Sequence, residues 1–491
     1  MLKLRNEPES KSIQFILLLK IKTTPCNTLS QNRLLYLGSV FLKYLSTKNK
    51  IIYFSNYSQH QATMKYKILH LVLLGCIISA CKNTLSTVPK KSPTGYQGQG
   101  ASPIVPTVNK PVQKQWKGIW SLDDQTYFSN DFDGARLNGV AEDGNDHYTI
   151  WITAENTPIN VSPWYSFKVW TGKPRKITIK LSYQDSRSRY YPKISDDGKH
   201  FKALDSVKFK IINPGEGDFG IKAAPEFVEI TIDIDNEPVW ISAQELYTSK
   251  RVREWVDSLS VKSFVSNHEI GRTHENRSMQ LIEIKEYPNT KKALMIISRQ
   301  HPPEVTGFLV MKSFMETISG DTEQAKNFRK KYAVFAVPLM NPDGVDNGHW
   351  RHNMGGIDLN RDWENFNQPE TKSVRDFLNK KSDEGYEFVF GADFHSTWDD
   401  IYYPIDSTVI GQKGKIVYDW IESITNRLPQ KNTNIAPSDK IRPTMVSRNY
   451  FYVHHGMPAI VFELGDNTPR DFLKEKGKVA AEEIMRLLLE Y

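Results

Sequence analysis

The chain has 491 residues, too many for one compact domain, so we expect two or more domains. Its formal net charge of +8 is concentrated at the N-terminus, because residues 1–81 contain eleven Lys or Arg and only two Asp or Glu. That segment carries +9 and the remainder about −1, which excludes the strongly basic surface that attracts phosphate backbones. We therefore expect no nucleic-acid partner.

The N-terminal region contains a segment that is typical of an export signal. A short basic start at Met64–Lys67 precedes an apolar run from Ile68 to Ile78, which is too short to span a membrane as a helix. The run ends in Ile78-Ser79-Ala80-Cys81, which resembles the bacterial lipobox, in which the cysteine is lipidated and becomes the first residue of the mature protein. We predict a signal peptide at 64–81, lipidation of Cys81 and an exported, membrane-anchored lipoprotein of a bacterial cell envelope. An uncleaved N-terminal anchor is the alternative.

Two segments flank this signal. Because Met64 opens a complete signal, residues 1–63 before it have no evident role, and we predict that they are a non-native upstream extension. A second targeting segment is the alternative. Residues 82–115 are rich in Pro, Ser, Thr, Gly, Gln and Lys and form a predicted disordered linker. None of the three cysteines lies beyond Cys81, which excludes a disulfide framework and a thiolate metal site in the rest of the chain.

Residues 116–245 are typical of an all-β domain. Runs of alternating apolar and polar residues occur at Tyr148–Ile152, Lys176–Leu181 and Phe227–Ile234, and turn residues lie between them. Asp196-Asp197-Gly198 predicts a hairpin turn. We expect a β-sandwich of about seven to nine strands.

Residues 246–491 alternate between helix and strand patterns. The predicted helices are Lys250–Leu259, Glu304–Ile318, Val417–Arg427 and Phe472–Leu489, and the predicted strands are Met279–Ile284, Ala293–Ile297, Tyr332–Val337, Phe388–Ala392 and Ala459–Phe462. This alternation predicts an α/β domain whose sheet is covered by helices on both faces. The candidate functional residues follow these strands, at the edge where open α/β sheets bind their ligands.

Two of these strands lead to possible metal ligands. His301-Pro-Pro-Glu304 follows the apolar run at 293–297, and Asp393-Phe394-His395 follows the run at 388–392. A histidine and a carboxylate three residues apart, together with a distant histidine, supply three ligands for a catalytic zinc and leave a fourth position for water. A single histidine at a strand end is usually an ordinary polar residue, so the case depends on the motifs that follow.

Three further motifs lie in the same region: Trp350-Arg351 followed by Gly356–Trp363, Phe462–Asp466 behind an apolar run, and Val337–Gly344. With the two histidine motifs, the set resembles the zinc carboxypeptidase family of the carboxypeptidase A type, over roughly Leu246 to Tyr491. The resemblance implies an α/β fold with a mixed sheet flanked by helices. It also implies one zinc per chain, with His301, Glu304 and His395 as its ligands. The preceding strands more loosely resemble the β-domain of cytosolic-type carboxypeptidases.

The resemblance also implies roles for five other residues. Asp358 would hydrogen-bond the first zinc histidine and fix its orientation. Asn360 and Arg361 would hold the α-carboxylate of a peptide with a free C-terminus, since a planar guanidinium suits bidentate capture of a carboxylate. Arg351 would polarise the scissile carbonyl, and Glu463 would be the general base that activates the zinc-bound water.

Some residues depart from the family pattern. The tyrosine that closes over the substrate is missing from Ile441–Thr444, although Tyr450 and Tyr452 are nearby. His454 and His455 have no place in the metal shell, and we expect them in a loop.

Two other functions compete with a carboxypeptidase. An aspartoacylase-like amidohydrolase acting on N-acyl amino acids shares part of the motif set, but Trp350-Arg351, Phe462-Glu463-Leu464 and the β-domain favour the carboxypeptidase. An inactive surface binding lipoprotein would be indicated by loss of a ligand or of Glu463, and none of these is missing.

Overall fold

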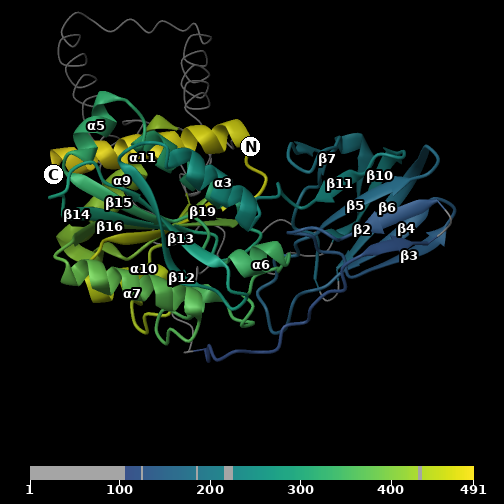
Figure 1. Cartoon of the computed structure of the whole chain (residues 1–491), viewed down its shortest axis with the longest axis horizontal. Helices are drawn as coiled ribbons and strands as arrows, with labels where there is room; N and C mark the ends of the chain where they lie inside the picture. Colours follow the sequence, from purple (N-terminus) through teal and green to yellow (C-terminus); the bar gives the residue numbers. More distant parts are fainter. Residues whose placement is uncertain (1–104, 123–124, 184–185, 215–224, 429–433) are drawn as a thin grey trace, which may run out of the picture. The chain divides into compact units, whose positions relative to one another are not determined.

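The computed structural model describes residues 105–122, 125–183, 186–214, 225–428 and 434–491 (Figure 1). The chain divides into two compact units, Met1–Ser86 and Thr87–Tyr491, and every described residue belongs to the second. The predicted upstream extension, the signal peptide, Cys81 and the first part of the linker therefore lie outside the described residues and stay predictions. Within the described ranges, no helix is both long and apolar enough to cross a membrane.

The N-terminal strands form two sheets that enclose one core. The six-stranded sheet has the order β1-β2-β5-β11-β7-β8 and the five-stranded sheet the order β3-β4-β6-β10-β9. Their bounds are β1 (Ile119–Ser121), β2 (Thr126–Ser129), β3 (Gly139–Gly144), β4 (His147–Ile152), β5 (Ser166–Thr171), β6 (Arg175–Tyr183), β7 (Lys193–Ser195), β8 (Lys202–Ala203), β9 (Phe209–Pro214), β10 (Pro225–Ile234) and β11 (Val239–Ser242), with a 3-10 turn, η2 (Ser206–Lys208), before β9.

The β-domain is thus a sandwich, as predicted, but its strand count was wrong. Eleven strands are present in the described part of the domain rather than seven to nine, because β1, β7 and β8 have only two or three residues each and are too short to produce an alternating pattern. Long strands do show it: alternate side chains of β6 are buried, including Ile177 and Ile179. The hairpin predicted at 196–198 is present, since β7 and β8 pair antiparallel on either side of it.

The C-terminal half contains an eight-stranded mixed sheet of order β12-β13-β15-β14-β16-β19-β17-β18. Its central strands β15, β14, β16 and β19 run parallel to one another. The pairs β12–β13, β13–β15 and β17–β19 are antiparallel, and β17 and β18 pair parallel. The bounds are β12 (Val265–Arg272), β13 (Ser278–Ile284), β14 (Lys292–Ser298), β15 (Tyr332–Val337), β16 (Glu387–Thr397), β17 (Ile401–Pro404), β18 (Asn434–Ile435) and β19 (Ala459–Gly465).

Helices cover both faces of this sheet, as predicted (Figure 1). One hydrophobic core joins the sheet to α3, α4, α9 and α11, and a second core on the other face joins it to α7 and α10. The helices and 3-10 turns are α3 (Ser249–Leu259), α4 (Val305–Ile318), α5 (Glu323–Arg329), α6 (Pro342–Asp346), η3 (Leu359–Arg361), α7 (Pro369–Asp383), α8 (Ser407–Ile410), η4 (Gly411–Gly414), α9 (Lys415–Arg427), α10 (Ser447–His455) and α11 (Arg470–Glu490).

One prediction about this region was wrong. His454 and His455 lie in the last turn of α10 rather than in a loop. The helix ends immediately after them because Gly456 adopts a left-handed backbone conformation with φ of 61°, which glycine tolerates without steric cost. The predicted domain boundary between 245 and 246 falls in the connection between β11 and α3, inside the second compact unit, and stays a prediction.

Candidate metal centre and active site

Three neighbouring parallel strands bring the candidate residues together. His301 follows β14, while His395 and Glu463 lie near the ends of β16 and β19. The three strands run in the same direction in the order β14-β16-β19, and His395 stands opposite Glu463 in the register. His395 and Glu463 therefore lie inside their strands rather than after them, but still at the carboxyl edge of the sheet where ligands are expected.

His301, Glu304 and His395 form a buried cluster that could hold a metal ion. The potential ligand atoms of the three residues lie within 4.8 Å of one another. His301 Nδ1 is 2.8 Å from Glu304 Oε1, and His395 Nδ1 is 2.6 Å from Glu304 Oε2. Both histidines are fully buried and Glu304 is 3% exposed. Two imidazoles and one carboxylate fit a catalytic zinc, which takes three protein ligands of these types.

The electrostatics of the cluster suit a cation. Burial raises the pKa of Glu304, but His301 and His395 outweigh that effect and hold it below its usual value. For His395, burial lowers the pKa, while the carboxylates of Asp393 and Glu304 raise it well above the usual value. Each side chain thus meets charges of the opposite sign, which is the arrangement expected where a positive ion replaces the protons.

A second carboxylate contacts the far nitrogen of each histidine. His301 Nε2 lies 2.8 Å from Asp358 Oδ1, and His395 Nε2 lies 2.9 Å from Asp393 Oδ2. Such partners fix the tautomer and orientation of a metal-binding imidazole. Asp358 was expected in this role, but Asp393 was missed. The signal was present in Asp393-Phe394-His395, because residues two apart on a strand lie on the same face.

Asp358 also connects the histidine to the other candidate residues. Arg351 Nε donates to Asp358 Oδ2 at 2.7 Å, and the backbone N–H of Asn360 donates to Asp358 Oδ1 at 2.9 Å. Burial raises the pKa of Asp358, but Arg351, His301 and Arg361 lower it well below its usual value. Arg361 Nη1 donates to the Asn360 carbonyl at 2.7 Å. The structure thus gathers these predicted residues around one carboxylate.

Glu463 is a buried carboxylate beside this cluster. It is 4% exposed, and its Oε2 has no hydrogen-bond partner among the described residues. Burial and the neighbouring charge of Glu304 raise its pKa to about 8, against the opposing effects of His395, Arg189 and Arg351. A buried carboxyl group with a strongly shifted pKa beside a cluster of possible metal ligands is a candidate for a chemical role.

The tyrosine expected to close over a substrate is not replaced by Tyr450. This residue is 3% exposed, and its ring lies 4.9 Å from that of Phe366 and 5.7 Å from that of Trp363. Because its ring is packed in the core, the Tyr450 side chain does not point freely toward the cluster of His301, Glu304 and His395.

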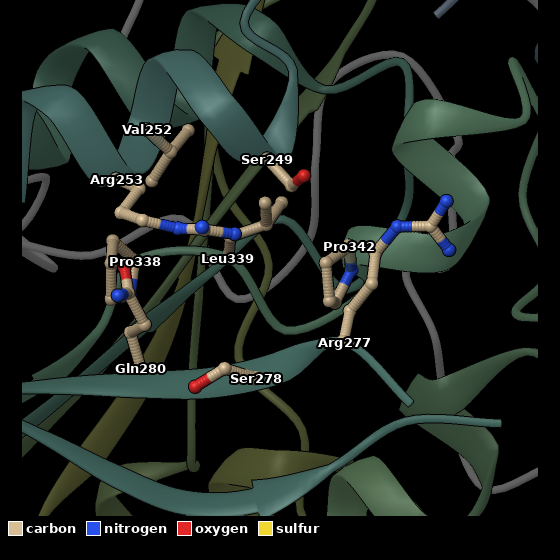
Figure 2. A pocket seen from close by; sticks show the side chains of 9 residues that line it. All are labelled: Ser249, Val252, Arg253, Arg277, Ser278, Gln280, Pro338, Leu339 and Pro342. Carbon is tan, nitrogen blue, oxygen red and sulfur yellow. The ribbon is translucent and has the colours of Figure 1, made fainter. Parts of the chain in front are cut away.

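A small pocket beneath α3 lies apart from these residues (Figure 2). Its volume is about 20 Å³, enough for a water molecule but far too small for a peptide. The lining side chains are Ser249, Val252, Arg253, Arg277, Ser278, Gln280, Pro338, Leu339 and Pro342, none of which is a predicted site residue.

Comparison with known proteins assigns the C-terminal half to a family. The family model that describes zinc carboxypeptidases matches residues 252–483. These residues form a zinc carboxypeptidase domain. An uncharacterized protein of Zymomonas mobilis is 24% identical over 265 residues, and cytosolic carboxypeptidase 6 of Caenorhabditis elegans is 25% identical over 231 residues. The matches cover 52% and 43% of this chain, and only 64% and 50% of the relatives' own lengths.

The fold of the zinc carboxypeptidase domain and its preceding strands recurs in solved structures. The crystal structure of a metallo-carboxypeptidase from Burkholderia cenocepacia superposes with a TM-score of 0.60 at 19% identity, over 74% of this chain and 99% of that one. Residues 246–491 make up only half of the chain, so the superposition extends into the β-domain. The matched family is zinc-dependent, and His301, Glu304 and His395, which form a group that could bind a metal ion, all lie within the matched residues.

Proposed function

We propose that the protein is a zinc metallocarboxypeptidase that removes the C-terminal residue from peptides. The observation that carries this proposal is the buried cluster of His301, Glu304 and His395 beside the buried carboxyl group of Glu463. When bound by these three residues, zinc would supply Lewis acidity, which polarises a carbonyl and lowers the pKa of water. The remaining chemistry falls to the side chains around the cluster.

Glu463 is the proposed general base. It takes a proton from the attacking water and returns that proton to the leaving amine, which requires a carboxyl group that exists in both forms near neutral pH. Burial in the apolar end of β19 supplies this property, since it raises the pKa of the side chain. The unpartnered Oε2 leaves one oxygen available for the transfer.

Arg351, Asn360 and Arg361 are proposed to bind the substrate. Arg351 would stabilise the negative charge that develops on the scissile carbonyl oxygen, and Asp358 holds its Nε at 2.7 Å. Asn360 and Arg361 would hold the free α-carboxylate, which makes the enzyme an exopeptidase. Asn360 is fixed from its other side by the Ser447 amide, which donates to its Oδ1 at 3.0 Å.

We also propose that the enzyme acts outside the cytoplasm as a lipoprotein anchored through Cys81. The supporting observations are in the sequence: a signal-like apolar run, the lipobox-like Ile78–Cys81 and a polar linker. The peptide substrate would then be met at a membrane surface.

A substrate panel tests the proposed activity. Full-length protein is incubated with unmodified peptides and, separately, with small N-acyl amino acids, before and after chelation and with zinc restored. We expect release of C-terminal residues from peptides that stops on chelation and returns with zinc. Hydrolysis of N-acyl amino acids alone would show an amidohydrolase instead, and binding of peptides without cleavage would show an inactive binding protein.

A further inference from the structure

A buried carboxylate of the β-domain holds the segment that carries Arg351. Glu155 is fully buried, and its two oxygens accept hydrogen bonds from three consecutive backbone amides. The Trp350 amide donates to Oε2 at 2.7 Å, and the Arg351 and His352 amides donate to Oε1 at 2.9 and 2.7 Å. Burial opposes the charge of Glu155, but His349, Arg136 and His352 outweigh it and lower its pKa.

Neighbouring residues of the β-domain extend this hold. Asn156 Oδ1 lies 2.6 Å from His352 Nδ1, and Asn156 Nδ2 donates to the Gly356 carbonyl at 3.1 Å. The indole of Trp350 donates to the Trp164 carbonyl at 3.1 Å. The loop is therefore fixed from Trp350 to Gly356, two residues before Asp358.

A second β-domain residue, Arg189, reaches the other side of the site. Its Nε donates to Asp466 Oδ2 at 2.7 Å, and its Nη2 donates to the Ser396 carbonyl at 3.1 Å. Nη1 donates to Ser162 Oγ at 2.7 Å, and the side chain is only 8% exposed. Ser396 follows His395 directly, and Asp466 lies three residues after Glu463. One guanidinium thus links the ends of β16 and β19.

We propose that Glu155 and Arg189 are positioning residues of the active site: Glu155 fixes the backbone of Arg351, and Arg189 fixes the strand ends that carry His395 and Glu463. This proposal rests on the proposed function. A purely structural role, in which the two side chains only hold the β-domain against the C-terminal half of the chain, explains the geometry less well. Burying a charged group costs free energy that an apolar contact avoids. Here both buried charged groups bind segments that carry candidate catalytic residues.

The test uses Glu155→Gln and Arg189→Lys in the full-length, zinc-loaded protein. Glutamine retains one acceptor oxygen but turns an NH2 group toward donors, and lysine keeps the charge but loses the planar fork. The matched control is Arg329→Lys. Arg329 is also buried, and it pairs with Glu286 at 2.9 Å and donates to the Ile318 and Gly320 carbonyls at 2.8 Å, without contact to any candidate site residue.

Four quantities are measured for each variant: kcat, KM, zinc per folded chain and amide hydrogen exchange. We expect kcat to fall about 10-fold to 100-fold for both variants, as for groups displaced by about 1 Å, with KM and zinc content nearly unchanged. Exchange should rise locally, at 349–356 for Glu155→Gln and at 463–468 for Arg189→Lys. Arg329→Lys should lower the melting temperature and leave kcat per folded chain unchanged.

Two outcomes would overturn the proposal. One is unchanged kcat per folded chain in both variants, and the other is unchanged exchange at 349–356 and 463–468. Exchange is measured without a substrate, so it judges the positioning claim even if wild-type protein releases no amino acid from peptides. That last result would instead defeat the proposed function.

Discussion

At the scale of single residues, Glu304 and Glu463 both lie beside His395 but differ in their pKa. Glu304 faces an imidazole nitrogen with each oxygen and has a lowered pKa, whereas Glu463 is buried with an unpartnered oxygen and has a pKa raised to about 8. Carboxyl groups separated in this way by their environment divide the work of metal binding and proton transfer. Their roles should therefore separate experimentally.

Glu463→Gln should retain zinc and lose activity. The amide has nearly the same volume but cannot accept a proton from water, so we expect kcat to fall about 100-fold to 10,000-fold while zinc per chain stays at one. The contrasting variant is His395→Ala, which removes a ligand and should lose zinc as well as activity. Zinc content by elemental analysis, measured beside peptide turnover, decides the matter. Full zinc in His395→Ala or substantial turnover in Glu463→Gln would contradict the assignment.

At the scale of elements, the first turn of α7 contains a buried carboxyl group that should make the stability depend on pH. Glu370 is fully buried, and Asn353 Nδ2 donates to its Oε2 at 2.9 Å. Burial is the main reason that its pKa is raised from 4.5 to about 8, and Asp343 and Asp362 add to the effect. The folded protein therefore binds a proton that the unfolded chain releases near pH 4.5.

This linkage gives Glu370 a defined pH dependence. Its contribution to the free energy of unfolding is fully present below about pH 4.5 and is lost as the pH rises toward about 8, at up to about 1.4 kcal/mol per pH unit. Glu370→Gln, which mimics the neutral form, should remove this slope. Denaturant unfolding at pH 5 and pH 8 should show the variant gaining stability over wild type at the higher pH. An equal difference at both pH values would mean that Glu370 is ionised when folded.

The contact between α4 and β16 depends on a glycine. A Cβ atom at Gly307 would stand 2.4 Å from the His395 carbonyl oxygen, so α4, whose N-cap residue is Glu304, lies directly against the backbone of His395. Gly307→Ala should lower the free energy of unfolding by about 1–3 kcal/mol through this overpacking and should weaken zinc binding. Gly172→Ala, where a Cβ meets nothing within 4 Å, is the matched control for thermal unfolding and zinc titration. Identical zinc affinity in the two variants would argue against this contact as a support of the site.

The sequence predicted elements well where burial is periodic and poorly where it is not. α4, α9, α11 and the central strands of the sheet each bury several apolar residues, and their patterns were recognised. α7 was missed because two of its four buried residues, Glu370 and Thr371, are polar, so its apolar pattern is weak. The candidate ligands were predicted from local motifs. Glu155 and Arg189, in contrast, bind residues more than 190 positions away in the sequence, and no local sequence pattern predicts such contacts.

At the scale of the whole molecule, location depends on Cys81, which lies outside the described residues. A thioether-linked diacylglycerol with an amide-linked acyl chain would anchor the protein stably, whereas a single chain would not. We predict that the mature protein starts at Cys81 and enters the detergent phase with membranes. The Cys81→Ser variant, which lacks the lipidated thiol, should become soluble. N-terminal sequencing and phase partitioning check this, and soluble cytoplasmic protein beginning at Met1 would overturn both the anchor and the interpretation of residues 1–63.

The central claim is that the molecule recognises a free C-terminus and removes the residue that bears it. Arg361 and Asn360 would lose their charge-assisted contacts to the substrate if that carboxylate became an amide. The most direct measurement compares cleavage of one peptide as the free acid and as the C-terminal amide, followed by mass spectrometry of the products. Only the free acid should be shortened, by one residue at a time. Equal cleavage of both peptides, or cleavage at internal bonds, would contradict it.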